Sequence, residues 1–255
     1  MMDDPWQFVP RRRPHAALRL ICLPFAGGAA SAFRSWADAL PESVEVRAIQ
    51  LPGREGRFAE PAMRQLPQVL QALAGALRPI TSCPYAVFGH SMGSILAFEL
   101  VRLLRRQGQS MPRHLFVSGR RAPHLSLGRR PFHDLPEMDL VAEIRRFDGD
   151  AHGLLDSAEM RALLLPAVRA DFALHDSYVY RDEAPLDVPM TAFGGMADAT
   201  TSEDDLHAWQ QHCLLPMSVQ MYAGGHFFIE AQRKHLLQAI SAQLRLSTPD
   251  QALAG

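Results

Sequence analysis

The sequence contains little of what several classes of protein require. Its three cysteines (Cys22, Cys83 and Cys213) stand far apart and form no Cys-x-x-Cys pair. This pattern fits a reduced, cytoplasmic protein better than a disulfide framework. No apolar run approaches the ~20 residues of a membrane-spanning helix. The net charge is only −1, so whole-chain electrostatics indicate neither nucleic acid nor a membrane as a partner.

Cofactor and metal motifs are also missing. A glycine-rich stretch at residues 24–30 matches neither G-x-G-x-x-G nor G-x-x-x-x-G-K-[ST], the usual phosphate-binding fingerprints. The histidines show no H-E-x-x-H pattern or other close paired spacing. We therefore expect neither a metal nor a bound cofactor.

The chain is organised around Gly89-His90-Ser91-Met92-Gly93, which a predicted strand enters and a predicted helix leaves. This is the G-x-S-x-G nucleophile elbow in its required strand–turn–helix setting. The pattern alone arises by chance in roughly one chain in ten of this length, so the argument depends on its context. In that context Ser91 presents its hydroxyl above the sheet. The backbone N–H of Met92 and the helix N-terminus would stabilise a developing oxyanion.

Apolar strands alternate with amphipathic helices on both sides of the elbow. This rhythm predicts an α/β fold with a mostly parallel central sheet flanked by helices. With 255 residues, the chain suits one large α/β domain. We predict a mobile lead-in over residues 1–17, a single domain over 18–246 and a disordered tail over 247–255. The predicted core strands cover residues 18–23, 44–50, 85–88, 114–118, 190–193 and 218–222.

The rhythm breaks between residues 129 and 182, where helical patterns continue without a clear core strand. Pro166 is expected to end or kink one of these helices. A helical insertion at this position would act as a lid over Ser91. The alternative is a pair of ordinary crossover helices.

A catalytic triad can be assembled in the order Ser, Asp, His that α/β-hydrolases use. Asp198 and His226 each follow a predicted strand, where sites form in open parallel sheets. Ser91 would attack an acyl carbonyl, His226 would act as general base and then general acid, and Asp198 would orient the imidazole. The nearby carboxylates of Asp187, Asp204 and Asp205 are the competing candidates. Of the eleven histidines, only His226 lies in a glycine loop between the last strand and the last helix.

The loop at residues 24–30 has a use in the same chemistry. Its backbone N–H at Ala26, or at the neighbouring Phe25, would complete an oxyanion hole with Met92.

Taken together, these motifs resemble the type II thioesterases of non-ribosomal peptide and polyketide synthases. The resemblance extends from about Leu18 to Leu244. Its motifs lie, in order, at residues 23–28, 51–57, 89–93, 118–123, 163–172 and 224–228. One difference concerns the position after Asp198, where family members often carry a second acidic residue and this chain has Ala199.

The resemblance implies an editing role and an α/β-hydrolase fold. Such enzymes remove stalled or wrong acyl groups from the phosphopantetheine arm of acyl or peptidyl carrier proteins, and a narrow channel would favour small acyl groups. Carrier proteins are acidic around the arm, so Arg120, Arg121, Arg129 and Arg130 could form a docking rim. The alternative is that these arginines are solvated or paired with nearby carboxylates.

Three other functions stay open at this point. The first is a free-standing esterase or lipase with the same triad. The second is a non-catalytic binding protein of the hydrolase fold, which would not need a complete triad. The third is acyl transfer, which would require the exclusion of water from the acyl-enzyme.

Overall fold

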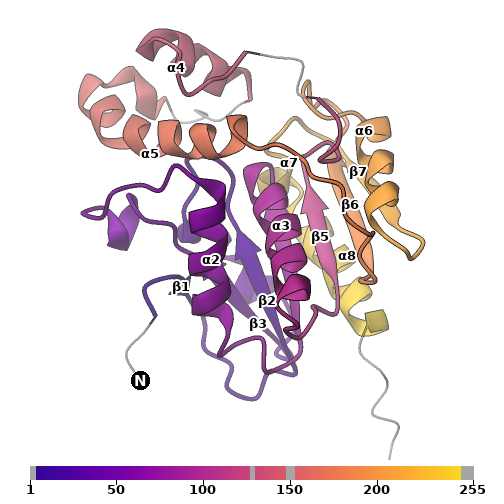
Figure 1. The fold of residues 1–255 in the computed structure, drawn as a ribbon. Coiled ribbons are helices and arrows are strands. Elements are labelled where there is room, and N and C mark those ends of the chain that lie inside the picture. The colour runs from indigo at the N-terminus through magenta and orange to yellow at the C-terminus, as the bar shows by residue number, and fades with distance from the viewer. Residues whose placement is uncertain (1–3, 127–129, 148–152, 248–255) are drawn as a thin grey trace, which may run out of the picture.

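A seven-stranded sheet forms the centre of the described part of the chain (Figure 1). The computed structural model describes residues 4–126, 130–147 and 153–247, and the side chains of this last range up to residue 245. The strand order is β1-β3-β2-β4-β5-β6-β7, and every neighbouring pair is parallel except β1 with β3. The strands are β1 (Gln7–Phe8), β2 (Leu18–Leu23), β3 (Val44–Ile49), β4 (Tyr85–His90), β5 (Leu115–Ser118), β6 (Met190–Gly195) and β7 (Ser218–Tyr222). The predicted α/β fold with a mostly parallel sheet is therefore confirmed.

Helices cover both faces of the sheet because the central strands bury both of theirs. In β2, Ile21 and Leu23 join one apolar cluster while Leu20 and Cys22 join the other, as the alternation of side chains along a strand requires. Helices α2 (Leu66–Leu77), α3 (Met92–Arg106) and α6 (Glu203–His207) contribute to the first cluster. Helices α1 (Trp36–Ala39), α7 (Phe228–Ala231) and α8 (Arg233–Ser247) contribute to the second. Short 3-10 helices lie at Ala30–Phe33, Glu55–Arg57, Leu154–Asp156 and Ala208–His212.

Residues 4–17 belong to this folded unit, whereas the sequence predicts a mobile lead-in over residues 1–17. Strand β1 pairs with β3, and the Arg13 side chain lies buried. Its guanidinium donates to the carbonyls of Ala37, Leu40, Pro41 and Val44, and so joins the C-terminal end of α1 to the start of β3. A single buried arginine leaves no periodic pattern in a sequence, which is why this segment was not predicted to be packed. The predicted tail lies outside the described residues apart from Ser247.

Helices α4 (Glu137–Arg146) and α5 (Ala158–Asp176) form a separate layer across one end of the sheet (Figure 1). They are inserted between β5 and β6, within the range predicted for a lid. The layer has a small apolar core of its own, made by Phe132, Leu135, Leu140, Val141, Leu155 and Leu165.

Pro166 was expected to end or kink a helix; it does not end α5, which continues through it to Asp176. A proline inside a helix costs roughly 3 kcal/mol. Burial of Leu165, Ala167 and Ala170 on the same helix offsets that cost.

Candidate active site

The turn between β4 and α3 holds Ser91 in an unusual backbone conformation. Its φ of +54° lies in a region that residues with a side chain rarely adopt, and its N–H donates to the Ser118 carbonyl at 2.7 Å. The flanking glycines make this turn possible. A Cβ on Gly89 would lie 2.0 Å from the Gly93 carbonyl oxygen, and one on Gly93 would lie 2.3 Å from that of Leu23. The predicted nucleophile elbow is present in full.

Asp198 and His226 meet where the loops after β6 and β7 lie side by side. The Ala197 N–H donates to the Gly224 carbonyl at 2.9 Å, which joins the two loops. His226 Nδ1 lies 2.7 Å from Asp198 Oδ2, and the aspartate side chain is fully buried. This contact sets the imidazole so that its other nitrogen, Nε2, is available to a substrate or nucleophile.

Thr200 holds the other oxygen of the same carboxylate. Its backbone N–H and its hydroxyl donate to Asp198 Oδ1 at 2.8 and 2.7 Å. Sequence reasoning missed this residue, although an Asp followed two positions later by Thr is a typical Asx-turn signal.

The electrostatics around Asp198 favour its charged form. Burial alone would raise the pKa of this carboxyl. The hydrogen bond and charge of His226, together with the two donors of Thr200, outweigh burial and lower the pKa below its ordinary value. An ionised carboxylate therefore faces His226 at neutral pH.

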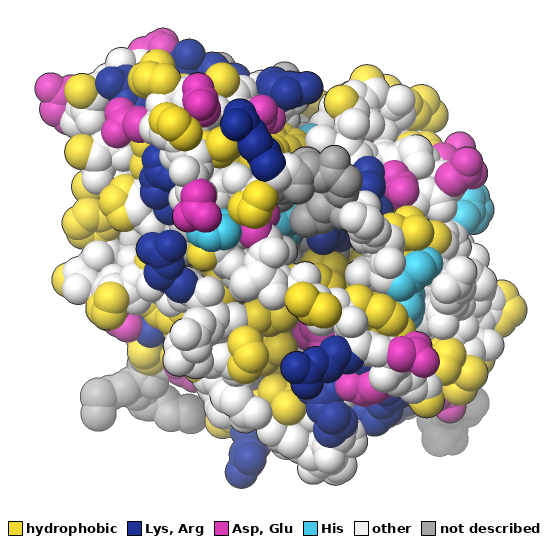
Figure 2. Space-filling model, turned by 45° about the horizontal axis from the view of Figure 1, so that its top comes forward, with side chains coloured by type: hydrophobic (Ala, Val, Ile, Leu, Met, Phe, Trp, Pro, Cys, Tyr) yellow, Lys and Arg dark blue, Asp and Glu magenta, His cyan; other side chains and the backbone are white. Residues whose placement is uncertain are grey.

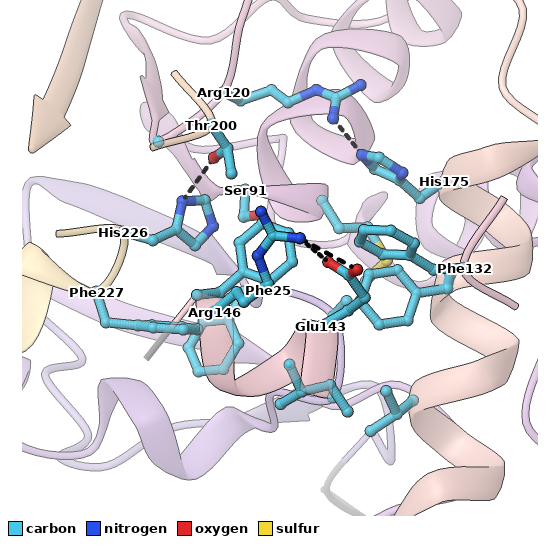
Figure 3. Close-up of a pocket in the computed structure, with 18 of the residues that line it drawn as sticks. Phe25, Ser91, Arg120, Phe132, Glu143, Arg146, His175, Thr200, His226 and Phe227 are labelled. Atoms are coloured by element: carbon cyan, nitrogen blue, oxygen red, sulfur yellow. Dashed lines mark hydrogen bonds and ion pairs between the residues drawn. The ribbon is translucent and has the colours of Figure 1, made fainter. Parts of the chain in front are cut away.

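Ser91 and His226 face one cavity of about 580 Å³, which Met92, Ala26 and Phe25 also line (Figure 3). Within the described residues no hydrogen bond joins Ser91 to His226. Such contacts in unliganded hydrolases often tighten only when substrate binds.

His90 supports this arrangement from below. It is fully buried, its Nδ1 lies 2.9 Å from Ser118 Oγ, and its ring centroid lies 5.2 Å from that of His226. Burial, followed by the charge of His226, lowers the pKa of His90 well below its ordinary value. A neutral His90 therefore packs beneath His226 without adding a positive charge to it.

The lid layer reaches the site directly. Phe147, at the end of α4, packs on His226 with 5.3 Å between ring centroids. Arg146 and Glu143 form an ion pair at the cavity (Figure 3). The apolar side chains that the lid segment adds to the lining are Phe132, Ile144, Phe147, Leu154, Leu155, Leu164, Val168 and Phe172. Sequence patterns did not assign these residues to the site, because their spacing indicates only amphipathic helices.

The predicted docking arginines have different environments. Arg120 is only 8% exposed and its guanidinium bonds to His175 inside the cavity, so it is not part of an exposed rim, contrary to expectation (Figure 3). Arg121 donates to the carbonyls of Ser126 and Thr200. Arg130 is exposed and lines the cavity, and Arg129 lies outside the described residues.

The charge around the cavity is mixed in sign. On the face that Figure 2 shows, Lys and Arg side chains lie among Asp and Glu side chains over the lid layer. Any attraction of an acidic partner to this face would therefore depend on a few arginines at the cavity and not on a uniformly basic surface.

The described residues include no group of three His, Cys, Asp or Glu side chains that could hold a metal ion. None of the helices in those residues is long and apolar enough to cross a membrane.

Comparisons with known proteins agree with this geometry. The thioesterase-domain family model matches residues 18–244. The gramicidin S biosynthesis protein GrsT of Aneurinibacillus migulanus is 42% identical over 231 residues, which cover 91% of this chain and 90% of that protein. Two solved structures are similar over most of their length. The RedJ thioesterase of the prodiginine pathway of Streptomyces coelicolor has a TM-score of 0.86 and 38% identity, covering 91% of this chain and 92% of that one. The type II thioesterase BorB of the borrelidin cluster has a TM-score of 0.88 and 36% identity, covering 96% and 100%. The chain therefore belongs to the thioesterase family, the thioester hydrolases of α/β-hydrolase fold that its motifs predict.

Proposed function

We propose that this protein is an editing thioesterase of the type II class, which hydrolyses stalled or wrong acyl groups from the phosphopantetheine arm of acyl or peptidyl carrier proteins. The observation that carries the proposal is the 2.7 Å contact between His226 and Asp198 at a cavity that also exposes Ser91. The similarity to BorB supports the type II class, since BorB is a type II thioesterase of the borrelidin biosynthetic cluster, and RedJ likewise comes from a biosynthetic pathway, that of prodiginine.

The residues act in two half-reactions. Ser91 Oγ attacks the thioester carbonyl while His226 Nε2 takes its proton, and the proton then passes to the departing thiol sulfur. This leaves the acyl group on Ser91 and restores the free thiol of the arm. Water then attacks the acyl-enzyme while His226 takes a proton from it, and His226 returns this proton to Ser91 Oγ as the bond to the acyl group breaks and the free acid leaves. Asp198 stabilises the charged imidazole in both halves.

Backbone N–H donors stabilise the negative charge that develops on the acyl oxygen. The N–H of Met92, at the start of α3, and that of Ala26, in the loop after β2, would form the oxyanion hole. The chemistry suits a thioester because a thiol, with a pKa near 8.5, leaves more readily than an alkoxide. This mechanism requires no cofactor beyond the arm that the substrate carries.

The helices between β5 and β6 serve as the lid over this site. Phe147 from α4 lies on His226, and α5 lines the cavity, so substrate must enter beside these helices. The carrier protein would approach this end of the sheet. A synthase partner places the enzyme in the cytoplasm.

Arg121 and Arg130 are the candidates for contact with an acidic carrier protein. Reversing both charges, with Arg121→Glu and Arg130→Glu, is expected to raise KM for an acylated carrier protein at low salt and to leave KM for a free small ester unchanged. Arg113→Glu is the matched control, because Arg113 is exposed and lies before β5, at the opposite end of the parallel strands. Equal KM values in the double variant and wild type would refute this docking surface.

The proposed function is tested by comparing one acetyl group on three carriers: a phosphopantetheinyl carrier protein, free pantetheine and a simple oxygen ester. The proposal predicts the highest kcat/KM on the carrier protein, and no turnover above background for Ser91→Ala. Higher kcat/KM on the oxygen ester than on carrier-bound thioesters, over a panel of acyl groups, would identify an esterase instead.

A further inference from the structure

The loop that supplies Ala26 is a tight turn with a defined geometry. The Gly28 N–H donates to the Phe25 carbonyl at 2.9 Å, which closes a four-residue β-turn with Ala26 and Gly27 at its centre. Gly27 has a φ of +75°, the value that the third residue of a type II turn requires. The central peptide therefore has one orientation, with the Gly27 N–H directed away from the turn.

A buried carboxylate from the lid layer accepts that N–H. Asp171, on α5, is 1% exposed, and its Oδ2 accepts from the Gly27 N–H at 2.8 Å. Arg54, from the loop after β3, holds the same carboxylate in a two-pronged contact, with nitrogen–oxygen distances of 2.5 and 2.7 Å. The same guanidinium donates to the Gly28 carbonyl at 3.1 Å. Two residues distant in sequence thus hold both sides of one short turn.

Helix α5 meets the turn a second time through Val168. A Cβ added at Gly27 would lie 2.8 Å from a methyl carbon of Val168. Val168 and Asp171 are three residues apart and therefore share one face of the helix. The turn rests against the lid helix through an apolar contact and through a charged one.

The Arg54–Asp171 ion pair also affects the electrostatics of the oxyanion hole. An isolated carboxylate one residue from Ala26 would oppose a negative charge forming on the substrate oxygen. Arg54 neutralises it at contact distance, so Asp171 can hold the turn without an electrostatic penalty at the site. Charge-assisted, bidentate contacts of this kind are the stronger and more directional ones.

We propose that Arg54 and Asp171 are positioning residues that hold the Phe25–Gly28 turn, and with it the Ala26 N–H, in register with the Met92 N–H. This inference rests on the proposed function in one respect, since it takes Ala26 as an oxyanion donor. It gives a role to two motifs that the triad leaves unexplained, residues 51–57 and 163–172. It also means that α5 is at once part of the lid and part of the support of the oxyanion hole.

Two variants test the proposal. The double variant Arg54→Met with Asp171→Leu replaces the ion pair by apolar side chains, which often preserves stability because no lone charge stays buried. The double variant nevertheless removes the carboxylate that accepts the Gly27 N–H. Asp171→Asn keeps the shape of the side chain and removes its negative charge. If the double variant does not fold, this single variant tests the positioning role of Asp171. The matched control is Glu99→Gln, which breaks the buried Glu99–Arg102 pair on α3, away from the turn.

Loss of one oxyanion donor lowers kcat by about 10²–10³-fold, so a displaced donor should lower it by roughly 10- to 100-fold. We expect this loss in the double variant, and a smaller loss in Asp171→Asn, whose amide oxygen can still accept from the Gly27 N–H but which lacks the charged two-pronged contact to Arg54, on an acylated carrier protein and on an oxygen ester alike. Affinity for a trifluoromethyl ketone analogue, which forms a tetrahedral oxyanion on serine, should fall by a similar factor. Affinity for an unreactive amide analogue should not change, and Glu99→Gln should keep the wild-type kcat.

Wild-type kcat in a folded double variant, or an equal loss of affinity for the ketone and the amide, would overturn the proposal. The oxygen-ester assay separates this outcome from failure of the proposed function. An enzyme that showed no preference for carrier proteins would still need its oxyanion hole.

Discussion

Removal of the Thr200 hydroxyl tests how tightly the carboxylate behind His226 must be held. In Thr200→Val the donor at 2.7 Å from Asp198 Oδ1 is lost. The backbone N–H of residue 200, at 2.8 Å from the same oxygen, is retained. Asp198 keeps its contact to His226 on the other oxygen, so the substitution loosens the triad without dismantling it.

The size of the effect follows from these contacts. A hydrogen bond to a charged group contributes about 1.5–3 kcal/mol, and each 1.36 kcal/mol corresponds to a factor of ten in rate. Because two of the three donors to the carboxylate persist, we expect the lower end of that range, a loss of about tenfold in kcat with little change in KM.

The effect of the substitution on stability depends on pH in a direction that follows from the pKa of Asp198. The Thr200 donors lower the pKa of Asp198, so the substitution raises that pKa while leaving the carboxyl ionised at neutral pH. A depressed pKa in the folded state contributes stability above the pKa of the unfolded chain and loses it as pH falls through the folded pKa. The difference in free energy of unfolding between wild type and variant should have its full size at pH 7 and should decrease as the pH falls below about 4.

Steady-state kinetics on an oxygen ester measure the change in kcat. Urea unfolding at several pH values measures the change in stability. Thr200→Ser, which keeps a hydroxyl, is the control and should remain within about threefold of wild type, a difference of under 1 kcal/mol. Wild-type kcat in Thr200→Val, or equal losses in the Ser and Val variants, would refute the assigned role of this hydroxyl.

Four further substitutions have clear expected results. Gly93→Ala should lower the free energy of unfolding by roughly 2 kcal/mol or more, because the new Cβ would lie 2.3 Å from the Leu23 carbonyl oxygen. Gly75→Ala, in open space on α2, should raise it by about 0.5–1 kcal/mol; equal effects of the two changes in urea unfolding would contradict the packing argument. Arg13→Met should destabilise the fold by roughly 3 kcal/mol, since it leaves several carbonyls without their donor, yet kcat of the folded enzyme should not change. Phe147→Ala removes the ring that lies on the candidate general base and should lower kcat/KM for apolar acyl groups more than for acetyl; an equal change over a series of chain lengths would argue against its place in the lid.

The central strands of the sheet were predictable because they are buried on both faces. Val, Ile, Leu and Phe in short runs between turn residues mark such strands, and β2 occupies the predicted residues. The capping box of Ser202 and Asp205 likewise fixes the start of α6. Pro166 does not end α5, because the packing of a long helix outweighs the local preference of proline for a helix end.

The site was predictable where the backbone demands particular residues. The elbow needs glycine at 89 and 93, and loops at the ends of parallel strands bring Asp198 and His226 together. The parts that escaped prediction depend on contacts between distant segments. Arg54 and Asp171 are 117 residues apart in sequence, and neither belongs to a spacing rule. Arg120 shows the reverse case: a charged loop residue predicts an exposed side chain, yet its guanidinium bonds to His175 within the cavity.

The central claim is that Ser91, assisted by His226 and Asp198, takes the acyl group from the carrier thioester. The most direct measurement is rapid quenching of the enzyme mixed with carrier protein bearing a labelled acetyl group, followed by peptide mapping by mass spectrometry. The account predicts that label appears on Ser91 before free acetate is released, and that no label appears in Ser91→Ala. Acetate release with label on another residue, or undiminished release by Ser91→Ala, would contradict it.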